Sequence, residues 1–198
     1  MKKMIIPILI AVAILTLFQS FMAISTNNIE KQPYRIIKKE KDFEIRYYPS
    51  ATFATIKSKA SNYRELSGSG FRRIANYIFG DNETSTKIAM TSPVHMDITE
   101  EGSSMSFVMP SAYNVNNLPK PTDSKVEIHE SKPEYAAVIE FGGYVNDAIL
   151  KRYAEQLQQS LEKHQIKSVG HYRYLGYNPP YQFINRRNEV IVEIEWKE

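Results

Sequence analysis

The chain has no cysteine among its 198 residues, and this absence excludes several kinds of site. Without thiols it forms no disulfide, carries no lipid-modified cysteine, binds no metal through thiolate and attaches no c-type haem covalently. Glycine is scarce as well, with eight residues, and there is no glycine-rich phosphate-binding loop. No Ser-His-Asp set or paired-carboxylate motif stands out, so the sequence gives no motif that indicates hydrolysis or phosphoryl transfer.

Metal-binding spacing and a strong net charge are also missing. The four histidines make no His-x-x-x-His pattern: His95, His129, His164 and His171. Taken singly, such residues are more often surface or hydrogen-bonded side chains than ligands. The formal charge of +3 falls to +1 without residues 1–25, which carry two lysines and no acid. A body this close to neutral argues against nucleic acid as a partner.

Residues 1–25 are predicted to be a signal peptide or an N-terminal membrane anchor. A basic start precedes an apolar run from Met4 to Phe18, and weaker apolar character continues to Ile24. The small residue Ser25 permits cleavage after it, yet a run of about 20 residues is also long enough to stay in a membrane. The basic start favours a cytoplasmic N-terminus, so the folded part is expected outside the cytoplasm, in a periplasm or on the outer face of the membrane.

Residues 26–33 are predicted to be a polar linker, and residues 34–198 a single domain. The length that remains after the leader is in the usual range for one domain with its own core. Alternating apolar and polar residues predict two antiparallel strands over 43–48 and 51–57. The next segment spaces apolar residues at i, i+3, i+4 and i+7, the stripe of one helix: Phe71, Ile74, Ala75 and Ile78.

Glycines and a proline modify these elements. Gly68 and Gly70 are expected to loosen the first turns of the helix, which begin at Tyr63. Residues 87–98 keep an approximate period of two on both sides of Pro93, as a strand with one buried face does. Because proline donates no ladder hydrogen bond, this strand is expected to bulge or to lie at a sheet edge there. Its hairpin partner is expected at residues 105–109.

The second half repeats the order of the first at low sequence identity. A helix capped by Asn146 or Asp147 is predicted to lie between two pairs of strands. Those strands are expected at 126–128, 135–141, 171–175 and 188–196. The helix has its own apolar stripe: Leu150, Tyr153, Ala154, Leu157 and Leu161. Two such halves predict an α+β fold around a shared core, with a space between helices and sheet that suits a flat apolar ligand.

Six segments, in order along the chain, resemble the SOUL haem-binding protein family. They are Phe43–Pro49, Lys87–Val94, Met105–Pro110, Leu118–Pro121, Gly176–Pro180 and Arg186–Val190. The resemblance covers about residues 34 to 194. It implies a distorted antiparallel β-barrel built from two pseudo-repeated halves, flanked by two main helices. It also implies a haem held without a covalent bond.

The resemblance implies a haem site made by the first helix and a loop near the Pro-Pro motif. Carried onto this chain, the apolar contacts are Phe71, Ile74, Ala75 and Ile78 on the helix and Tyr177 on the loop. Arg72 and Arg73 are the candidate partners of the propionates, because a guanidinium binds a carboxylate through two parallel hydrogen bonds. The helical stripe is also needed for packing on the sheet, and a core role for Phe71 and Ile74 is the alternative.

Three further residues receive expectations. His95 stands where family members more often have a small polar residue, and it is a candidate axial ligand. Its position in the strand opposes that of its two neighbours, which favours solvent or a cleft. Arg186 and Arg187 are expected in a solvated turn or in a salt bridge to a nearby carboxylate.

The function expected from the resemblance is reversible haem buffering or carriage in an apolar cleft, without enzymatic activity. The partners would be haem or a related tetrapyrrole, no nucleic acid, and a membrane only through the N-terminal segment. One alternative is a module for another amphipathic small molecule, because the doubled half also resembles gyrase-inhibitor-like effector domains. The other is an enzyme acting on haem, for which His95, His171 and tyrosines are the available groups.

Overall fold

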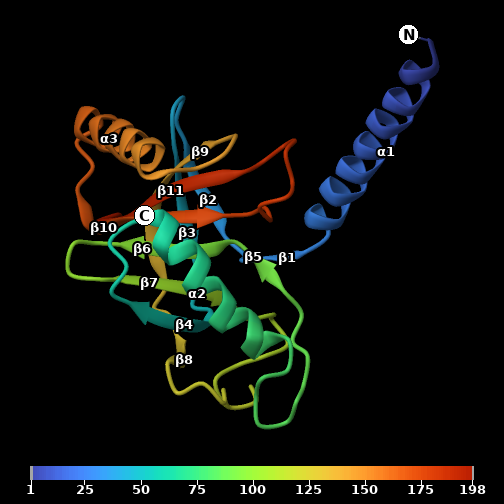
Figure 1. Cartoon of the computed structure of the whole chain (residues 1–198). Helices are drawn as coiled ribbons and strands as arrows, with labels where there is room; N and C mark the ends of the chain where they lie inside the picture. Colours follow the sequence, from blue (N-terminus) through green and yellow to red (C-terminus); the bar gives the residue numbers. More distant parts are fainter. Residues whose placement is uncertain (1, 198) are drawn as a thin grey trace.

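The computed structural model describes residues 2–197, apart from the side chains of 2–5, 11 and 27. One long helix, α1 (Lys2–Asn27), projects from a folded domain in which two helices lie on a large antiparallel sheet (Figure 1). The fold class is therefore α+β, as predicted. The strands of the first half are β1 (Glu30–Lys31), β2 (Arg35–Lys39), β3 (Glu44–Tyr48), β4 (Thr52–Ser58), β5 (Thr91–Ser92), β6 (Val94–Ile98) and β7 (Ser103–Val108). Those of the second half are β8 (Val126–Glu130), β9 (Glu134–Phe141), β10 (Ser168–Gly176) and β11 (Asn188–Ile194).

The large sheet has the strand order β2-β3-β9-β11-β10-β6-β7-β4-β8. Apart from β2, this order reads the same from both ends when the two halves are exchanged, because β3 pairs with β9 while β8 pairs with β4. The first strand of each half thus lies beside the second strand of the other, and β6 meets β10 at the centre. In the described part of the chain no pairing joins the edge strands β2 and β8, so the predicted closure into a barrel is not confirmed.

The first domain helix, α2 (Tyr63–Ile78), packs closely on β4 and β7. Its N-cap is Asn62, whose side chain accepts a hydrogen bond from the Glu65 amide at 3.0 Å. A Cβ at Gly70 would lie 3.1 Å from Ile56 Cδ1, so the glycine permits the close approach of helix and sheet. The expected loosening of the first turns is wrong, because packing against the sheet outweighs the low helix propensity of glycine.

The second domain helix, α3 (Asp147–Lys163), begins as predicted and packs less deeply. The Asn146 side chain accepts a hydrogen bond from the Ile149 amide at 2.9 Å, which confirms the N-cap. Leu157 and Leu161 are buried, whereas Leu150 in the first turn is only half-buried. The N-terminal part of α3 therefore stands off the sheet.

Pro93 marks the point at which the chain changes its strand partner. Before it, β5 pairs in parallel with β1 in a separate two-stranded sheet. After it, β6 runs between β10 and β7 in the middle of the large sheet. The proline does interrupt the pairing, but the expected edge position is wrong for β6, since the ladder resumes on both sides of that strand.

The two domain helices share one face of the sheet, and the main hydrophobic core lies between them and the strands. Alternate strand residues point to the other face, which neither α2 nor α3 covers and which we call the helix-free side. It has a smaller apolar cluster: Tyr48, Ala136, Val138, Leu175, Tyr177 and Ile191. The residue before a core position thus faces the helix-free side. Because of this alternation, the helix side of the sheet is mainly apolar, whereas the helix-free side also buries charged residues such as Arg46 and Glu189.

Helix α1 is long and apolar enough to cross a membrane. The stretch Ile6–Thr26 has 21 residues and a mean hydropathy of 2.3, and few of its side chains are buried. A signal sequence near the N-terminus has the same properties, so length and composition leave both predictions open. The basic side chains of Lys2 and Lys3 lie outside the described ones.

Candidate functional site

A cleft of about 540 Å³ opens on the helix side of the sheet, beside the N-terminal part of α3. We call it the α3 cleft. Met96, Tyr174 and Val190 contribute side chains from β6, β10 and β11, which are the strands at the junction of the two halves. The rest of its lining comes from the β6–β7 turn, α3 and β10: Ile98, Thr99, Glu100, Glu101, Asp147, Leu150, Lys151, Ala154, Gly170, His171, Tyr172 and Arg173.

The lining of the α3 cleft combines an apolar body with charged and titratable groups. Leu150 and Ala154 are half-buried on the side of α3 that faces the strands. Lys151 and His171 supply a cation and an imidazole. At one end the Asp147 carboxylate accepts a hydrogen bond from the Tyr63 amide at 2.7 Å, which ties the start of α2 to the start of α3. This combination suits an amphipathic ligand of small-molecule size.

A second cavity of about 520 Å³ lies along the exposed side of α2, and we call it the α2 pocket. Arg72 and Arg73 line it, but Arg73 is paired with Asp123 at 2.6 Å. The other lining residues are mostly polar or small: Gly68, Ser69, Asn76, Tyr77 and Asp81. Tyr77 donates a hydrogen bond from its hydroxyl to the Pro119 carbonyl at 2.9 Å. The α2 pocket therefore offers cations but little apolar surface.

The structure separates the residues that the family resemblance grouped. Ile74, Ala75 and Ile78 are buried, and Ile74 and Ile78 belong to the main core, so the core role foreseen for Ile74 is confirmed. Phe71 is 38% exposed, and its ring centroid lies 5.4 Å from that of Phe107. Tyr177 is buried on the helix-free side of the sheet, away from the α2 stripe. The α2 pocket does not include Tyr177, and the cavity of about 270 Å³ that Tyr177 lines includes no residue of α2.

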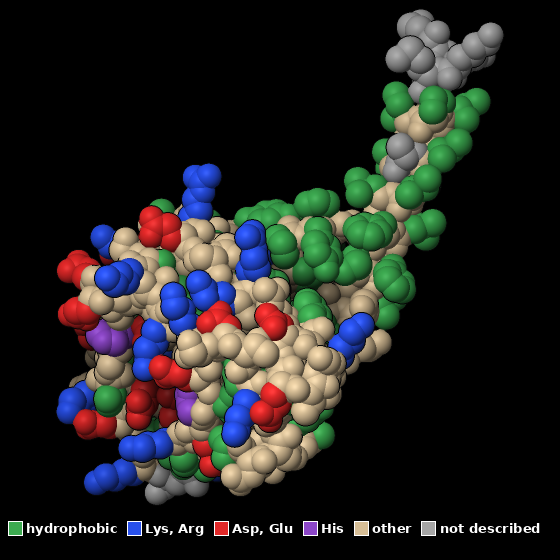
Figure 2. Space-filling view, turned by 60° about the horizontal axis from the view of Figure 1, so that its bottom comes forward, with side chains coloured by type: hydrophobic (Ala, Val, Ile, Leu, Met, Phe, Trp, Pro, Cys, Tyr) green, Lys and Arg blue, Asp and Glu red, His purple; other side chains and the backbone are tan. Residues whose placement is uncertain are grey.

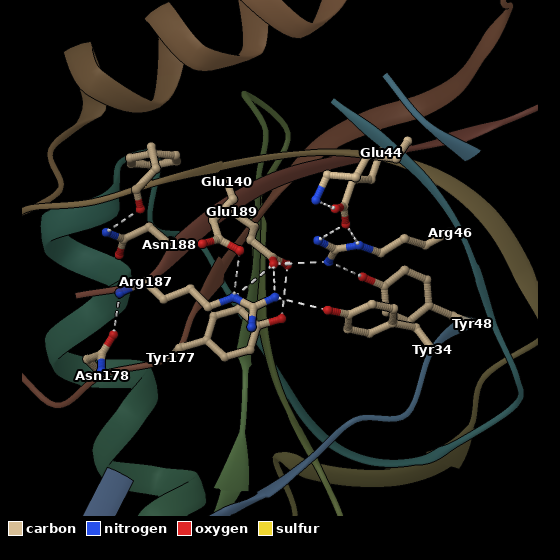
Figure 3. A network of polar contacts seen from close by, with 12 residues as sticks. Tyr34, Glu44, Arg46, Tyr48, Glu140, Tyr177, Asn178, Arg187, Asn188 and Glu189 are labelled. Atoms are coloured by element: carbon tan, nitrogen blue, oxygen red, sulfur yellow. Dashed lines mark hydrogen bonds and ion pairs between the residues drawn. The ribbon is translucent and has the colours of Figure 1, made fainter. Parts of the chain in front are cut away.

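Tyr177 belongs instead to a buried polar network on the helix-free side (Figure 3). Glu189 is fully buried and accepts hydrogen bonds from Arg46 at 3.0 Å, Arg187 at 2.5 Å and the Tyr177 hydroxyl at 2.9 Å. Arg46 also bonds Glu44 and Tyr48, and its guanidinium lies 4.2 Å from the centroid of the Tyr34 ring. Three of the family segments, 43–49, 176–180 and 186–190, meet in this network.

Electrostatic interactions in this network favour the charged forms of its two arginines, Arg46 and Arg187. Burial alone would lower the pKa of the Arg46 guanidinium, but the adjacent Glu189 carboxylate reverses this and raises it. The pKa of Arg187 is raised in the same way. Burial and the Glu189 charge both raise the pKa of Tyr177, which stays protonated. Arg187 also pairs with Glu140 at 3.1 Å, and the expected salt bridge at this residue is confirmed.

His95 is buried beneath the sheet and lines neither the α3 cleft nor the α2 pocket. It faces away from Met96, as strand parity predicted, but the expected exposure to solvent or a cleft is wrong because the N-terminal segment covers it. Its Nε2 atom lies 2.7 Å from the Gln32 Oε1 atom, and its ring packs edge-on against Phe53. Burial, with a smaller contribution from the charge of Arg173, lowers the pKa of His95 to about 3.

Sequence reasoning missed the α3 cleft because it treated the stripe of the second helix as uniform. Leu150 and Ala154 satisfy the same helical spacing as Leu157, yet they border open space. The sequence offered one signal for the cleft, the exposed polar turn Glu100–Glu101, which follows β6 beside β10 and lines the cleft. No group of three His, Asp or Glu side chains that could hold a metal ion occurs among the residues described.

Comparison with solved structures identifies the same fold at very low sequence identity. The EcmrR C-terminal domain matches with a TM-score of 0.60 and 10% identity, over 83% of this chain and 99% of that one. A hydrolase from Listeria innocua matches with a TM-score of 0.55 and 7% identity, over 80% of this chain and 94% of that one. At such identities the likeness concerns the fold alone.

Comparison with known sequences gives a family. Heme-binding protein 1 of Xenopus laevis is 29% identical over 173 residues, which are 82% of this chain and 90% of that protein. Heme-binding protein 2 of Homo sapiens is 29% identical over 157 residues, which are 75% and 76% of the two chains. The model of the SOUL heme-binding protein family matches residues 29–193. The chain therefore belongs to the SOUL heme-binding protein family.

Proposed function

We propose that this protein binds haem, or a related tetrapyrrole, reversibly and without a covalent bond. Membership of the SOUL family and the names of its relatives support the ligand class. The α3 cleft supports a location for the ligand, because it has a volume of about 540 Å³ and an apolar lining next to cationic side chains. Ligand clefts of a few hundred Å³ commonly combine these two features.

The α3 cleft offers a haem apolar contacts, a cation and an imidazole, and the carboxylates of Glu100, Glu101 and Asp147 in the same lining would disfavour propionates beside them. Leu150 and Ala154, which are only half-buried, would contact the macrocycle, and Met96, Tyr174 and Val190, mostly buried in the main core, would form the floor of the cleft. Apolar contact would supply most of the affinity. Lys151 would attract a propionate, and His171 offers an imidazole nitrogen at the same cleft. Haem iron brings redox and ligand-binding chemistry when it is bound. Since the cleft is open to solvent, we infer exchange of the ligand, hence buffering or carriage.

The site inferred from the family resemblance remains a competing location for the same ligand. It consists of Phe71, Ile74, Ala75 and Ile78 on α2, the two arginines beside them, and Tyr177. In its favour, Phe71 is partly exposed and Arg72 lines the α2 pocket. Against it, the three aliphatic side chains are already buried against the sheet. We therefore propose the α3 cleft first.

An absorbance titration with haem tests both the function and the location. The wild-type chain should give a saturable Soret change, and its absence would remove the haem proposal altogether. Ala154→Trp, which fills the α3 cleft, should weaken affinity by about tenfold or more, equal to about 1.4 kcal/mol. Ala148→Trp places the same side chain on the exposed side of α3 and should change affinity little. It is the matched control.

The double variant Arg72→Glu/Arg73→Glu tests the competing location. Near-normal affinity in this variant, with weak binding by Ala154→Trp, supports the α3 cleft. The reverse result would move the haem to α2. Saturable binding of a different amphipathic compound, without a Soret change from haem, would instead favour a general small-molecule module.

We further propose that the protein is not an enzyme and that α1 keeps it at a membrane, with the domain outside the cytoplasm. Helix α1 has the length and hydropathy of a spanning helix, which supports an anchor. Incubation of the haem-loaded protein with a reductant should leave the haem spectrum intact apart from reduction of the iron. Conversion of haem to another pigment over many turnovers would contradict the first part of this proposal.

A further inference from the structure

We propose that the β10–β11 loop, residues 177–187, rests in the surface of the lipid bilayer beside α1. This goes beyond anchoring by the N-terminal segment alone, because it gives the folded domain its own contact with the membrane. The inference rests on the hydrogen bonds between α1 and this loop, and on the apolar side chains that the loop exposes.

The loop is fastened to α1 by hydrogen bonds that use polar residues of an otherwise apolar helix. Gln19 Nε2 donates to the Tyr181 carbonyl at 3.1 Å, and Gln19 Oε1 accepts from the Phe183 amide at 2.8 Å. Nearer the end of the helix, the Thr26 hydroxyl donates to Gln182 Oε1 at 2.9 Å. Gln19 is only 3% exposed, whereas most neighbouring apolar side chains of α1 are open.

The position of Gln19 along α1 sets the depth of the loop. Gln19 precedes Thr26, the last residue of the apolar span, by two helical turns, or roughly 10 Å at 1.5 Å per residue. A free amide at that depth is costly in lipid, because its donor and acceptor have no water to bond. The backbone of the loop satisfies both. The same bonds satisfy a carbonyl and an amide of the loop, so this stretch of loop backbone tolerates an apolar environment.

The side chains of the loop are those that membrane interfaces favour. Tyr181, Phe183 and Ile184 are more than half exposed, and so is Tyr144 from the neighbouring turn. The rings of Tyr144 and Phe183 are 6.4 Å apart between centroids. Aromatic side chains gather at the boundary of a bilayer, where an apolar ring and a polar tip are both accommodated.

These exposed side chains continue the apolar surface of α1 onto the domain. Figure 2 shows hydrophobic side chains running from the helix onto the adjoining surface. On α1, Phe18, Phe21 and Ile24 are exposed in the part of the helix that contains Gln19 and Thr26. A patch that is continuous with a helix of membrane-spanning length has the bilayer as its natural partner. No residue of the loop lines the α3 cleft, so this proposal and the haem proposal can fail separately.

Arg186 holds the loop in the shape that presents its apolar side chains. Its guanidinium donates to the carbonyls of Pro179 at 2.7 Å and Gln182 at 2.8 Å. The same group lies 4.6 Å from the centroid of the Tyr144 ring. The loop is therefore already organised before it meets a lipid, and insertion costs little further ordering.

The test uses the full chain in phosphatidylcholine vesicles that contain lipids brominated along the acyl chains. Phe183→Trp, made in a Trp196→Phe background, reports from the loop. Val115→Trp in the same background reports from an exposed apolar position on the β7–β8 connection. Brominated lipid should quench the Phe183→Trp probe roughly twofold and leave the Val115→Trp probe nearly unchanged, because only an interfacial side chain meets the acyl chains. Equal, weak quenching of both probes would overturn the proposal.

A second variant tests the link between helix and loop. Gln19→Leu removes both hydrogen bonds, and it should reduce quenching of the Phe183→Trp probe while the chain stays in the vesicle. Ser20→Leu is the control, since the Ser20 hydroxyl bonds only within α1, to the Thr16 carbonyl at 2.9 Å. No difference between the two leucine variants would overturn the link. A mature protein found by mass to lack residues 1–25 would overturn the proposal as a whole.

Discussion

The two halves of the large sheet have matching strand order but different packing. The α2 half-sheet comprises β6, β7, β4 and β8, and the α3 half-sheet comprises β10, β11, β9 and β3. Over the first, α2 buries a nearly continuous stripe: Leu66, Gly70, Ile74, Ala75, Tyr77 and Ile78. Over the second, α3 buries only Leu157 and Leu161 and leaves a cleft beside its first turns.

The helix-free faces of the two half-sheets differ as well. Under the α3 half-sheet, Arg46 and Glu189 form the centre of a buried charged network (Figure 3). Under the α2 half-sheet the buried contacts contain no ion pair among the described residues: Thr55 bonds Ser106 at 2.7 Å and His129 at 2.8 Å, and the ion pair of Lys57 with Glu127 is exposed. The comparison teaches that strand order fixes where the halves meet, whereas side-chain size and charge decide which half is dense and which holds a cavity.

The largest expected effect concerns the charged network. Glu189→Gln removes the carboxylate that pairs with two arginines, and it should lower the free energy of unfolding by about 3–5 kcal/mol, as loss of one partner of a buried ion pair does. Thr55→Val, the neutral counterpart in the α2 half-sheet, should cost about 1–2 kcal/mol. Urea denaturation of both variants measures the difference. Equal losses would show that the two helix-free faces are energetically alike.

A smaller effect should separate the packing of the two helices. Ile74→Ala creates a cavity in the main core and should cost about 3 kcal/mol, within the range for buried aliphatic truncations. Leu150→Ala removes a half-buried side chain next to the α3 cleft and should cost about 1 kcal/mol or less, because open space is already present. Thermal and urea unfolding give both values. A cost for Leu150→Ala as high as that for Ile74→Ala would mean that α3 is as tightly packed as α2.

Smaller than the losses expected for Glu189→Gln and Ile74→Ala is the pH dependence that His95 introduces in the α2 half-sheet. The pKa of this histidine is lowered to about 3 in the folded protein, so below the ordinary value near 6.5 the unfolded chain binds an extra proton. Folding stability should therefore fall as pH falls, by about 2 kcal/mol between pH 7 and pH 5 from this residue alone.

His95→Gln is the variant that isolates this contribution. It keeps a polar side chain near Gln32 but cannot titrate, and its stability curve should be flatter than that of the wild type over that pH interval. Urea midpoints measured at several pH values give the two curves. Parallel curves would assign the acid sensitivity to other groups.

The sequence predicted the order of the main elements from β3 onward, but it did not predict β1, β2, the division of residues 87–98 at Pro93, or the depth of packing. Strong periodicity and caps, such as Asn146 before α3, are local signals, and the structure confirms them. The doubled order of strands and helices was also visible along the chain. Whether the sheet closes depends on the twist and pairing of strands far apart in sequence, and these leave β2 and β8 as separate edges.

The candidate site was harder to infer, because an apolar stripe marks the side of a helix that faces the sheet without showing how close the sheet lies. Ile74 and Leu150 look alike in sequence, yet one is fully buried and the other borders a cleft. His95 was misjudged for a related reason. Its strand parity was right, but the segment that covers it, including Gln32, is remote in sequence.

The exchange of first strands between the halves has a consequence for assembly. Because β3 pairs with β9 and β8 pairs with β4, neither half completes its own sheet. Two copies of the chain that trade halves satisfy every one of these pairings without any new contact surface. Exchange of halves between two chains would therefore give a reciprocal dimer, and the length and stiffness of the segment between β7 and β8 would decide between the two arrangements.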